Sequence, residues 1–214
     1  MPRERKSRKP NVERTLRIFC EGEKTEPYYL KGYIDEFREN NRVAVVAIER
    51  TRKNTPIQLV DEAIALKKSD RSLPGDVFWV VYDRESVAKY SRAKHSEAWE
   101  KAVRAGINVA LNNVCFEYWV LLHFTESSAA YSSYDDLRDN SGLRAEIQKL
   151  CGRDYEKSSQ VIFSHLKAHI SDARGRANRI NRRVVEASTT GALPFDVNPY
   201  TGMPSLLDAI DGFK

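Results

Sequence analysis

The first half of the chain alternates short apolar runs with helical patterns. Strands are predicted where β-branched and aromatic residues gather, at residues 15–20, 42–49, 77–82 and 107–112. The helices predicted between and after them begin at Pro27, run from Pro56 to about Lys68, and cover residues 92–105, before Gly106, and 116–124. This alternation predicts an α/β fold, with a parallel sheet of about four strands flanked by helices and joined by right-handed crossovers.

The second half of the chain carries helical patterns without a further strand. These patterns lie between Asp135 and about Ala187, and residues 198–210 are predicted to form a turn and one short helix. We therefore predict a single domain over residues 15–214 after a basic arm at 1–14. Its parts are an α/β core at about 15–125, a helical insert at about 135–190 and a C-terminal segment at 191–214.

Length and composition agree with one globular domain. The chain has 214 residues, of which 41% are hydrophobic, so a disordered protein is excluded. It contains no apolar run of about 18 residues and no apolar region of a secretory signal near its N-terminus. Three widely separated cysteines suit neither a disulfide scaffold nor a zinc site. We expect a cytoplasmic protein without a membrane partner.

Positive charge is concentrated in two segments. The formal net charge is +5, with +4 on residues 1–14 and +5 on residues 167–183, so the rest of the chain carries −4. Such a distribution favours binding to nucleic acid. The alternative is a solvated tail and a solvated helix face. Charge alone does not decide between them.

Acidic residues stand where two of the predicted strands end. Glu21 directly follows the first strand, Glu26 opens the next helix, and Asp83 and Glu85 follow the third strand. In a doubly wound, Rossmann-type sheet of order 2-1-3-4, the first and third strands are neighbours and their carboxyl ends face the ligand crevice. These oxygen ligands suit Mg²⁺ or Mn²⁺. The alternative is that they cap helix N-termini.

A phosphate-binding loop is excluded at the first turn. If Lys24-Thr25 ended a Walker sequence, glycine would be needed at positions 18 and 23, where the chain has Ile18 and Glu23.

Four segments of the chain resemble the RloB family. They read CEGEKTEPYY, VVYDRES, LNNVCFEYWVLLHF and NPYTGM, and the resemblance spans about residues 15–210. That family is related to Toprim domains, and its genes often stand beside restriction–modification or abortive-infection genes and an ATPase of the OLD/AAA type. The resemblance implies a Toprim-like fold and metal-dependent nuclease activity.

The resemblance also implies roles for individual residues. Glu21 matches the Toprim glutamate, a metal ligand or general acid/base, and Glu26 matches a second glutamate of OLD-like nucleases. Asp83 and Glu85 fall on the Asp-x-Asp pair, with glutamate replacing the second aspartate. From its place near the start of the helix after the fourth strand, Glu117 is a further candidate for the same crevice. The usual NPCFE of the family reads NNVCFE here, without the proline.

Basic residues of the second half are candidates for phosphate contact. They are Arg174, Arg176, Arg179 and Arg183, of which the last three share a helix face, and Lys157, which resembles a recurrent lysine of the family. His123 is interpreted as a packed or hydrogen-bonded histidine.

Two functions of different class follow. The first is a Toprim-type nuclease that acts on RNA or DNA in an anti-phage, abortive-infection or restriction-linked defence system, together with an ATPase partner. The second is a non-catalytic module that binds nucleic acid or an ATPase and acts as a sensor or regulator. Two features keep the non-catalytic function open. Position 85 is glutamate instead of aspartate, and no catalytic lysine or histidine is evident beside the carboxylates. The oligomeric state is left open.

Overall fold

A computed structural model describes residues 14–37, 44–53, 55–152 and 159–214. The predicted basic arm, except for Arg14, and the candidate Lys157 lie outside these residues. The elements in chain order are β1 (Arg14–Cys20), α1 (Thr25–Phe37), β2 (Ala44–Glu49), α2 (Pro56–Lys67), β3 (Val77–Asp83), α3 (Arg92–Ala105), β4 (Asn108–Asn113), α4 (Phe116–Leu121), α5 (Tyr134–Asn140), α6 (Leu143–Cys151), α7 (Ile162–Leu166), η1 (Lys167–His169), α8 (Ile170–Glu186), η2 (Pro194–Asp196), β5 (Tyr200–Thr201) and α9 (Met203–Gly212).

The α/β fold is confirmed, with a five-stranded sheet of order β2-β1-β3-β4-β5. The first four strands are parallel and appear in the predicted order 2-1-3-4. The fifth, β5, has two residues and runs antiparallel to β4, with Thr201 opposite Asn112. The sequence prediction missed it, because two residues are too few to show a period of alternation.

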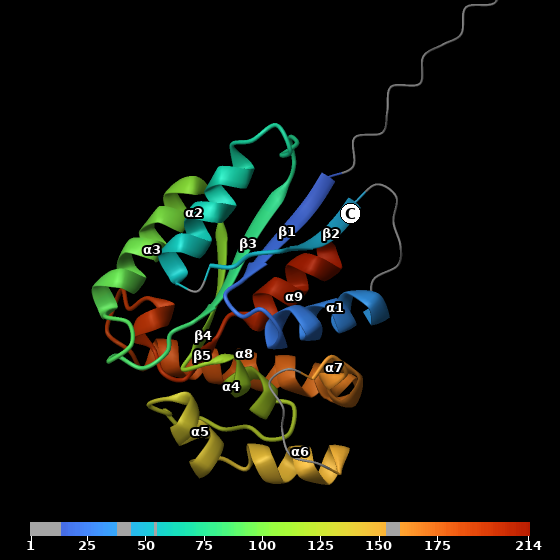
Figure 1. Cartoon of the computed structure of the whole chain (residues 1–214). Coiled ribbons are helices and arrows are strands. Elements are labelled where there is room, and N and C mark those ends of the chain that lie inside the picture. The colour runs from blue at the N-terminus through green and yellow to red at the C-terminus, as the bar shows by residue number, and fades with distance from the viewer. Residues whose placement is uncertain (1–13, 38–43, 54, 153–158) are drawn as a thin grey trace, which may run out of the picture.

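Helices cover both faces of the sheet. Helices α2 and α3 lie against one face, and α1, α4, α8 and α9 lie against the other (Figure 1). The alternation along β3 explains how: Phe78 and Val80 belong to the core under α2 and α3, while Trp79 and Val81 belong to the core on the opposite face. Because both faces are covered, β3 is almost continuously apolar, as predicted for a central parallel strand.

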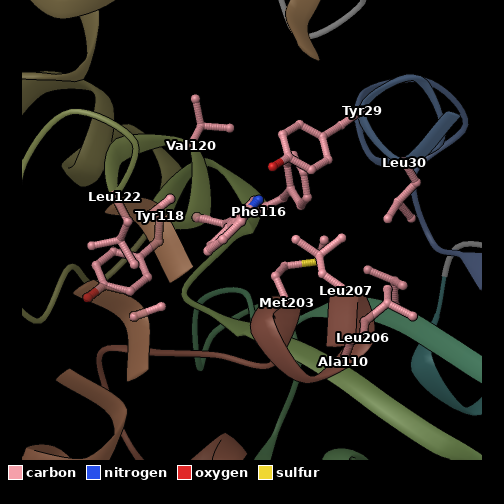
Figure 2. Close-up of a cluster of buried hydrophobic side chains, with 14 of the residues drawn as sticks. Tyr29, Leu30, Ala110, Phe116, Tyr118, Val120, Leu122, Met203, Leu206 and Leu207 are labelled. Atoms are coloured by element: carbon pink, nitrogen blue, oxygen red, sulfur yellow. The ribbon is translucent and has the colours of Figure 1, made fainter. Parts of the chain in front are cut away.

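The larger core joins α9 to the beginning of α4 and to α1. Met203 and Leu207 approach Phe116 and Tyr29 in this core, and all four side chains are buried (Figure 2). The approach depends on Gly202, because a Cβ at that position would lie only 2.8 Å from the Cα of Ala110 in β4. The C-terminal segment is therefore packed directly on the sheet.

Helix α4 is shorter than the apolar run that predicted it. The prediction extended to residue 124, but the helix ends at Leu121 and a turn follows. The Arg176 guanidinium of α8 donates to the main-chain carbonyls of Leu122 and His123, each at 2.9 Å. Arg176 thus supplies hydrogen bonds to carbonyls that would have been bonded within α4 if the helix had continued as predicted.

Among the described residues, no helix is both long and apolar enough to cross a bilayer.

Candidate functional site

Strands β1 and β3 bring Glu21 and Asp83 to the same edge of the sheet. The amide of Glu21 donates to the carbonyl of Val81 at 2.9 Å, which extends the ladder between β1 and β3 by one bond. The amide of Asp83 donates to Oε2 of Glu21 at 3.2 Å. The Glu21 carboxylate therefore lies at the carboxyl end of β3, where the sequence predicted the two acids to meet.

Asp83 lies at the centre of a group of carboxylates. Burial raises the pKa of Asp83 well above its usual range, and four further carboxylates raise it more, those of Glu26, Glu117, Glu21 and Glu85. All the predicted acidic site residues are thus close enough to interact with Asp83. We call these five residues the acidic cluster.

Two members of the acidic cluster are buried in helix N-terminal turns. Glu26 in α1 is 7% exposed and Glu117 in α4 is 2% exposed. Gly22 makes room for Glu26, since a Cβ at position 22 would lie 2.7 Å from the carboxyl carbon of Glu26. The glycine of the Glu21–Gly22 turn therefore allows the second glutamate to reach the cluster.

Burial also raises the pKa of Glu21, to about 7. The Asp83 amide hydrogen bond and Lys89 oppose this shift, whereas Glu85 and Glu26 add to it. Glu21 therefore exchanges its proton near neutral pH.

The loop after β3 places a lysine at the cluster that sequence reasoning missed. Lys89 pairs with Glu85, at 2.6 Å between Nζ and Oε1. Glu85 itself has a positive φ of 55°. The i,i+4 spacing of the pair was visible in the sequence. Outside a helix, however, only the observed loop conformation brings the two side chains together.

Buried Arg84 holds that loop in place. Its Nε donates to the carbonyl of Phe195 at 3.0 Å and its Nη1 to the carbonyl of Tyr90 at 2.9 Å. Nε2 of His95 lies 2.9 Å from the carbonyl oxygen of Arg84. Burial lowers the pKa of His95 to about 4, so this imidazole is neutral at neutral pH and donates there. Arg84 and His95 are thus positioning residues for Glu85 and Lys89.

Strand β4 adds an amide to the cluster. Nδ2 of Asn112 lies 3.4 Å from Oδ1 of Asp83, and the hydroxyl of Thr201 in β5 donates to Oδ1 of Asn112 at 2.8 Å. The undetected strand β5 therefore orients a side chain that faces Asp83. The peptide bond between Asn113 and Val114, at the end of β4, is cis, and the NPCFE pattern of the RloB family has proline at the position of Val114.

The chemistry of the donors fits a hard divalent cation. The cluster presents several carboxylates that repel one another, and Mg²⁺ prefers oxygen ligands of this kind. In the part of the chain that the structure describes, no three His, Cys, Asp or Glu side chains are already arranged as a metal-ligand group. The carboxylates are thus grouped electrostatically but not in ligand geometry.

The predicted phosphate-binding arginines of α8 make contacts within the protein. Arg174 donates to Asp211 at 2.8 Å and to the Tyr33 hydroxyl at 2.9 Å, and it also pairs with Asp208. Arg176 caps α4, as described above. These two side chains join α8 to its neighbours.

Arg179 and Arg183 share one partner. Both pair with Glu126, Arg179 at 2.7 Å. Of the three arginines predicted to share a face, these two therefore have a common partner, whereas Arg176 contacts main-chain carbonyls. Their side chains remain 56% and 59% exposed, which leaves them accessible to a phosphate.

His123 is packed, as interpreted from the sequence. Its Nε2 lies 3.0 Å from the Tyr29 hydroxyl and its Nδ1 lies 3.0 Å from the carbonyl oxygen of Trp119. Burial lowers its pKa to about 3. This histidine stabilises the core between α1 and α4.

Comparison with known proteins gives one match. The family model described as RloB-like protein matches residues 16–210. No curated protein and no solved structure matches the chain.

Proposed function

Because the chain belongs to the RloB-like protein family, we propose that it is a Toprim-type, divalent-metal-dependent nuclease that hydrolyses phosphodiester bonds of RNA or DNA. The observation that carries the proposal is the acidic cluster, in which Glu21 and Asp83 meet at the carboxyl edge of the sheet. Ligand sites of open α/β sheets lie at this edge.

Each residue of the cluster has a role in the proposed reaction. Glu21, Asp83 and Glu85 would hold Mg²⁺ or Mn²⁺. Glu26 and Glu117, both buried beside Asp83, would orient the attacking water and accept its proton. When bound, the cation supplies Lewis-acid stabilisation of charge on the phosphate oxygens.

Lys89 supplies the positive charge that the sequence reading lacked. Its ammonium group lies beside Glu85 and within electrostatic reach of Glu21. It would donate a hydrogen bond to the departing oxygen, on which negative charge develops as the bond breaks. Arg84 and His95 would act by holding the loop that presents it.

The wider setting is also proposed from the family. We propose a cytoplasmic protein of an anti-phage or abortive-infection system that acts with an ATPase of the OLD/AAA type. The arginine pair of α8, Arg179 and Arg183, would contact nucleic acid outside the cluster.

A non-catalytic nucleic-acid- or ATPase-binding module is the second candidate. It is favoured by the ion pair between Glu85 and Lys89. The ammonium group of Lys89 already engages Glu85, the second acid of the predicted Asp83–Glu85 metal-binding pair.

A cleavage assay distinguishes the two. The full chain is incubated with labelled tRNA, mRNA and plasmid DNA in Mg²⁺ or Mn²⁺, alone and with its neighbouring ATPase. We expect cleavage by the unmodified protein and by Glu97→Ala, which removes an exposed carboxylate on α3, and a loss of at least about 100-fold in Glu21→Ala and Asp83→Ala.

Circular dichroism establishes that each variant is folded. Equal cleavage by Asp83→Ala and Glu97→Ala would refute the site. If the protein binds the nucleic acids but cleaves none of them in either Mg²⁺ or Mn²⁺, the result would support the non-catalytic module.

A further inference from the structure

A cavity of about 660 Å³ opens beside the acidic cluster, between the ends of β1 and β2. Its lining includes Gly22, Glu23, Tyr28, Lys31, Arg50 and Arg52. It thus shares the turn after β1 with the candidate site, and it extends that site toward the edge strand β2. Its volume is in the range of pockets that hold small organic ligands.

Two arginines of this cavity are available to a ligand. Arg50 and Arg52 follow β2 and are exposed. Within the described ranges, no hydrogen bond or ion pair engages either guanidinium. The arginines of α8 differ, because four of them are held by Glu126, Asp208, Asp211 or main-chain carbonyls. The two arginines that line the cavity therefore have guanidinium groups that no acid of the described residues engages.

The acidic residues of the cavity do not cancel this charge. Glu49 is 17% exposed and pairs with Arg17 at 2.6 Å. Arg17 also pairs with Asp76, and Arg71 lies 3.9 Å from Glu49, so two arginines offset these two carboxylates. Glu23 is exposed at the mouth. A carboxylate there accepts hydrogen bonds from a base amino group or a sugar hydroxyl, which a nucleotide carries and a bare phosphate does not.

Tyr28 adds an aromatic surface to the wall. It lies in the first turns of α1, is partly buried, and lines the same cavity as the arginines. Successive bases of single strands stack on aromatic side chains, whereas bases within a duplex are already stacked on each other. A positively charged groove with an aromatic wall is typical of sites for single-stranded nucleic acid.

We propose that this cavity binds one unstacked nucleotide of a single-stranded substrate, next to the bond that is cleaved. Arg50 and Arg52 bind its phosphates, and Tyr28 stacks on its base. The strand order places β2 two strands from β3, or about 10 Å, so a short length of backbone reaches both the cavity and Asp83. The inference rests on the proposed nuclease function, and it names the class of its substrate.

Binding is measured separately from cleavage. Fluorescence anisotropy of labelled single strands, RNA and DNA of one sequence, is followed without divalent cations in a Glu21→Ala background. Adding Arg50→Ala/Arg52→Ala is expected to weaken binding at least tenfold and to reduce the slope of log affinity against log salt by about 1.4, the value for two phosphate contacts on a single strand.

Matched variants control for charge and for the aromatic ring. Lys68→Ala/Arg104→Ala removes the same charge from exposed positions at the ends of α2 and α3, and its affinity is expected to stay within about twofold. Tyr28→Ala is expected to weaken binding about fivefold or more, and Tyr28→Phe is expected to retain it, because the stacking ring remains.

The outcomes separate the two proposals. Two results would overturn the cavity assignment. One is equal affinity of the two double variants. The other comes from a labelled duplex of the same sequence: Tyr28→Ala would weaken its binding as much as it weakens binding of the single strand. A protein that binds as expected but cleaves nothing would refute the nuclease and leave the nucleotide site standing. The RNA and DNA arms identify the sugar that the cavity accepts.

Discussion

Glu21 illustrates how a single residue depends on its neighbours. In sequence it is an acid after a strand, equally suited to capping a helix. In the structure its carboxylate accepts the amide of a residue 62 positions later and lies beside several other acids. Burial and this repulsion favour its protonated form, which gives the residue a titration that the sequence did not predict.

The pKa of Glu21, about 7, predicts a dependence of stability on pH. In EDTA, the folded protein holds this proton more tightly than the unfolded chain. The stabilisation that the Glu21 proton gives the folded protein is therefore fully present below about pH 4.5 and is lost as pH rises through 7. From pH 5 to 8, Glu21 should lower the free energy of unfolding by at most about 3 kcal/mol.

Urea denaturation of the unmodified protein and Glu21→Gln at several pH values checks this. The difference between their curves removes the contributions of buried His95 and His123, which act in the opposite direction in both proteins. It reports the titration of Glu21 together with its effect on the pKa of Asp83. Glu97→Gln serves as the control. Parallel curves for the first two proteins would contradict the raised pKa.

At the scale of elements, α8 shows why a pattern of arginines does not specify a binding surface. The sequence predicted a basic helix, and the helix is present. Its arginines differ in role according to the neighbouring element: Arg174 faces α9 and α1, Arg176 caps α4, and Arg179 and Arg183 share Glu126. Helix periodicity predicted one face for Arg176, Arg179 and Arg183, but it did not predict the different groups that these arginines contact.

Arg174 is therefore expected to stabilise the packing of α8 on α9. Arg174→Ala removes hydrogen bonds to Asp211 and Tyr33 from a side chain that is only 24% exposed. We expect a loss of about 1–2 kcal/mol in the free energy of unfolding, measured by denaturant titration. Arg182→Ala, at an exposed position of the same helix, should change it by less than about 0.5 kcal/mol. Equal effects of the two variants would refute a structural role for Arg174.

At the scale of the whole molecule, the sheet edge gathers charges that destabilise the cation-free protein. Carboxylates from the turn after β1, from α1, from the loop after β3 and from α4 raise the pKa of Asp83, which ends β3. A divalent cation bound among them would relieve their repulsion. The same convergence that supports a metal-dependent activity therefore predicts stabilisation by the metal.

Thermal unfolding tests this coupling. Mg²⁺ at about 100 times its dissociation constant should add about 2.7 kcal/mol, or roughly 5–10 °C in melting temperature for a chain of this size. Potassium chloride of equal ionic strength should add little. In Asp83→Asn the increase caused by Mg²⁺ should fall to less than about a quarter. An unchanged increase in that variant would place the cation elsewhere.

The sequence by itself determined the α/β class, the parallel order of four strands and the edge at which Glu21 and Asp83 meet. These features follow from local periodicity and from the topology of crossovers, both of which can be read along the chain. It did not determine β5, the early end of α4, the partners of the α8 arginines, or the approach of Lys89 to Glu85. Each of these depends on contacts between segments distant in sequence, or on a loop conformation without a repeating pattern. Only the tertiary structure decided which charges are neutralised within the protein and which, at Arg50 and Arg52, belong to residues that line the cavity without an acidic partner among the described residues.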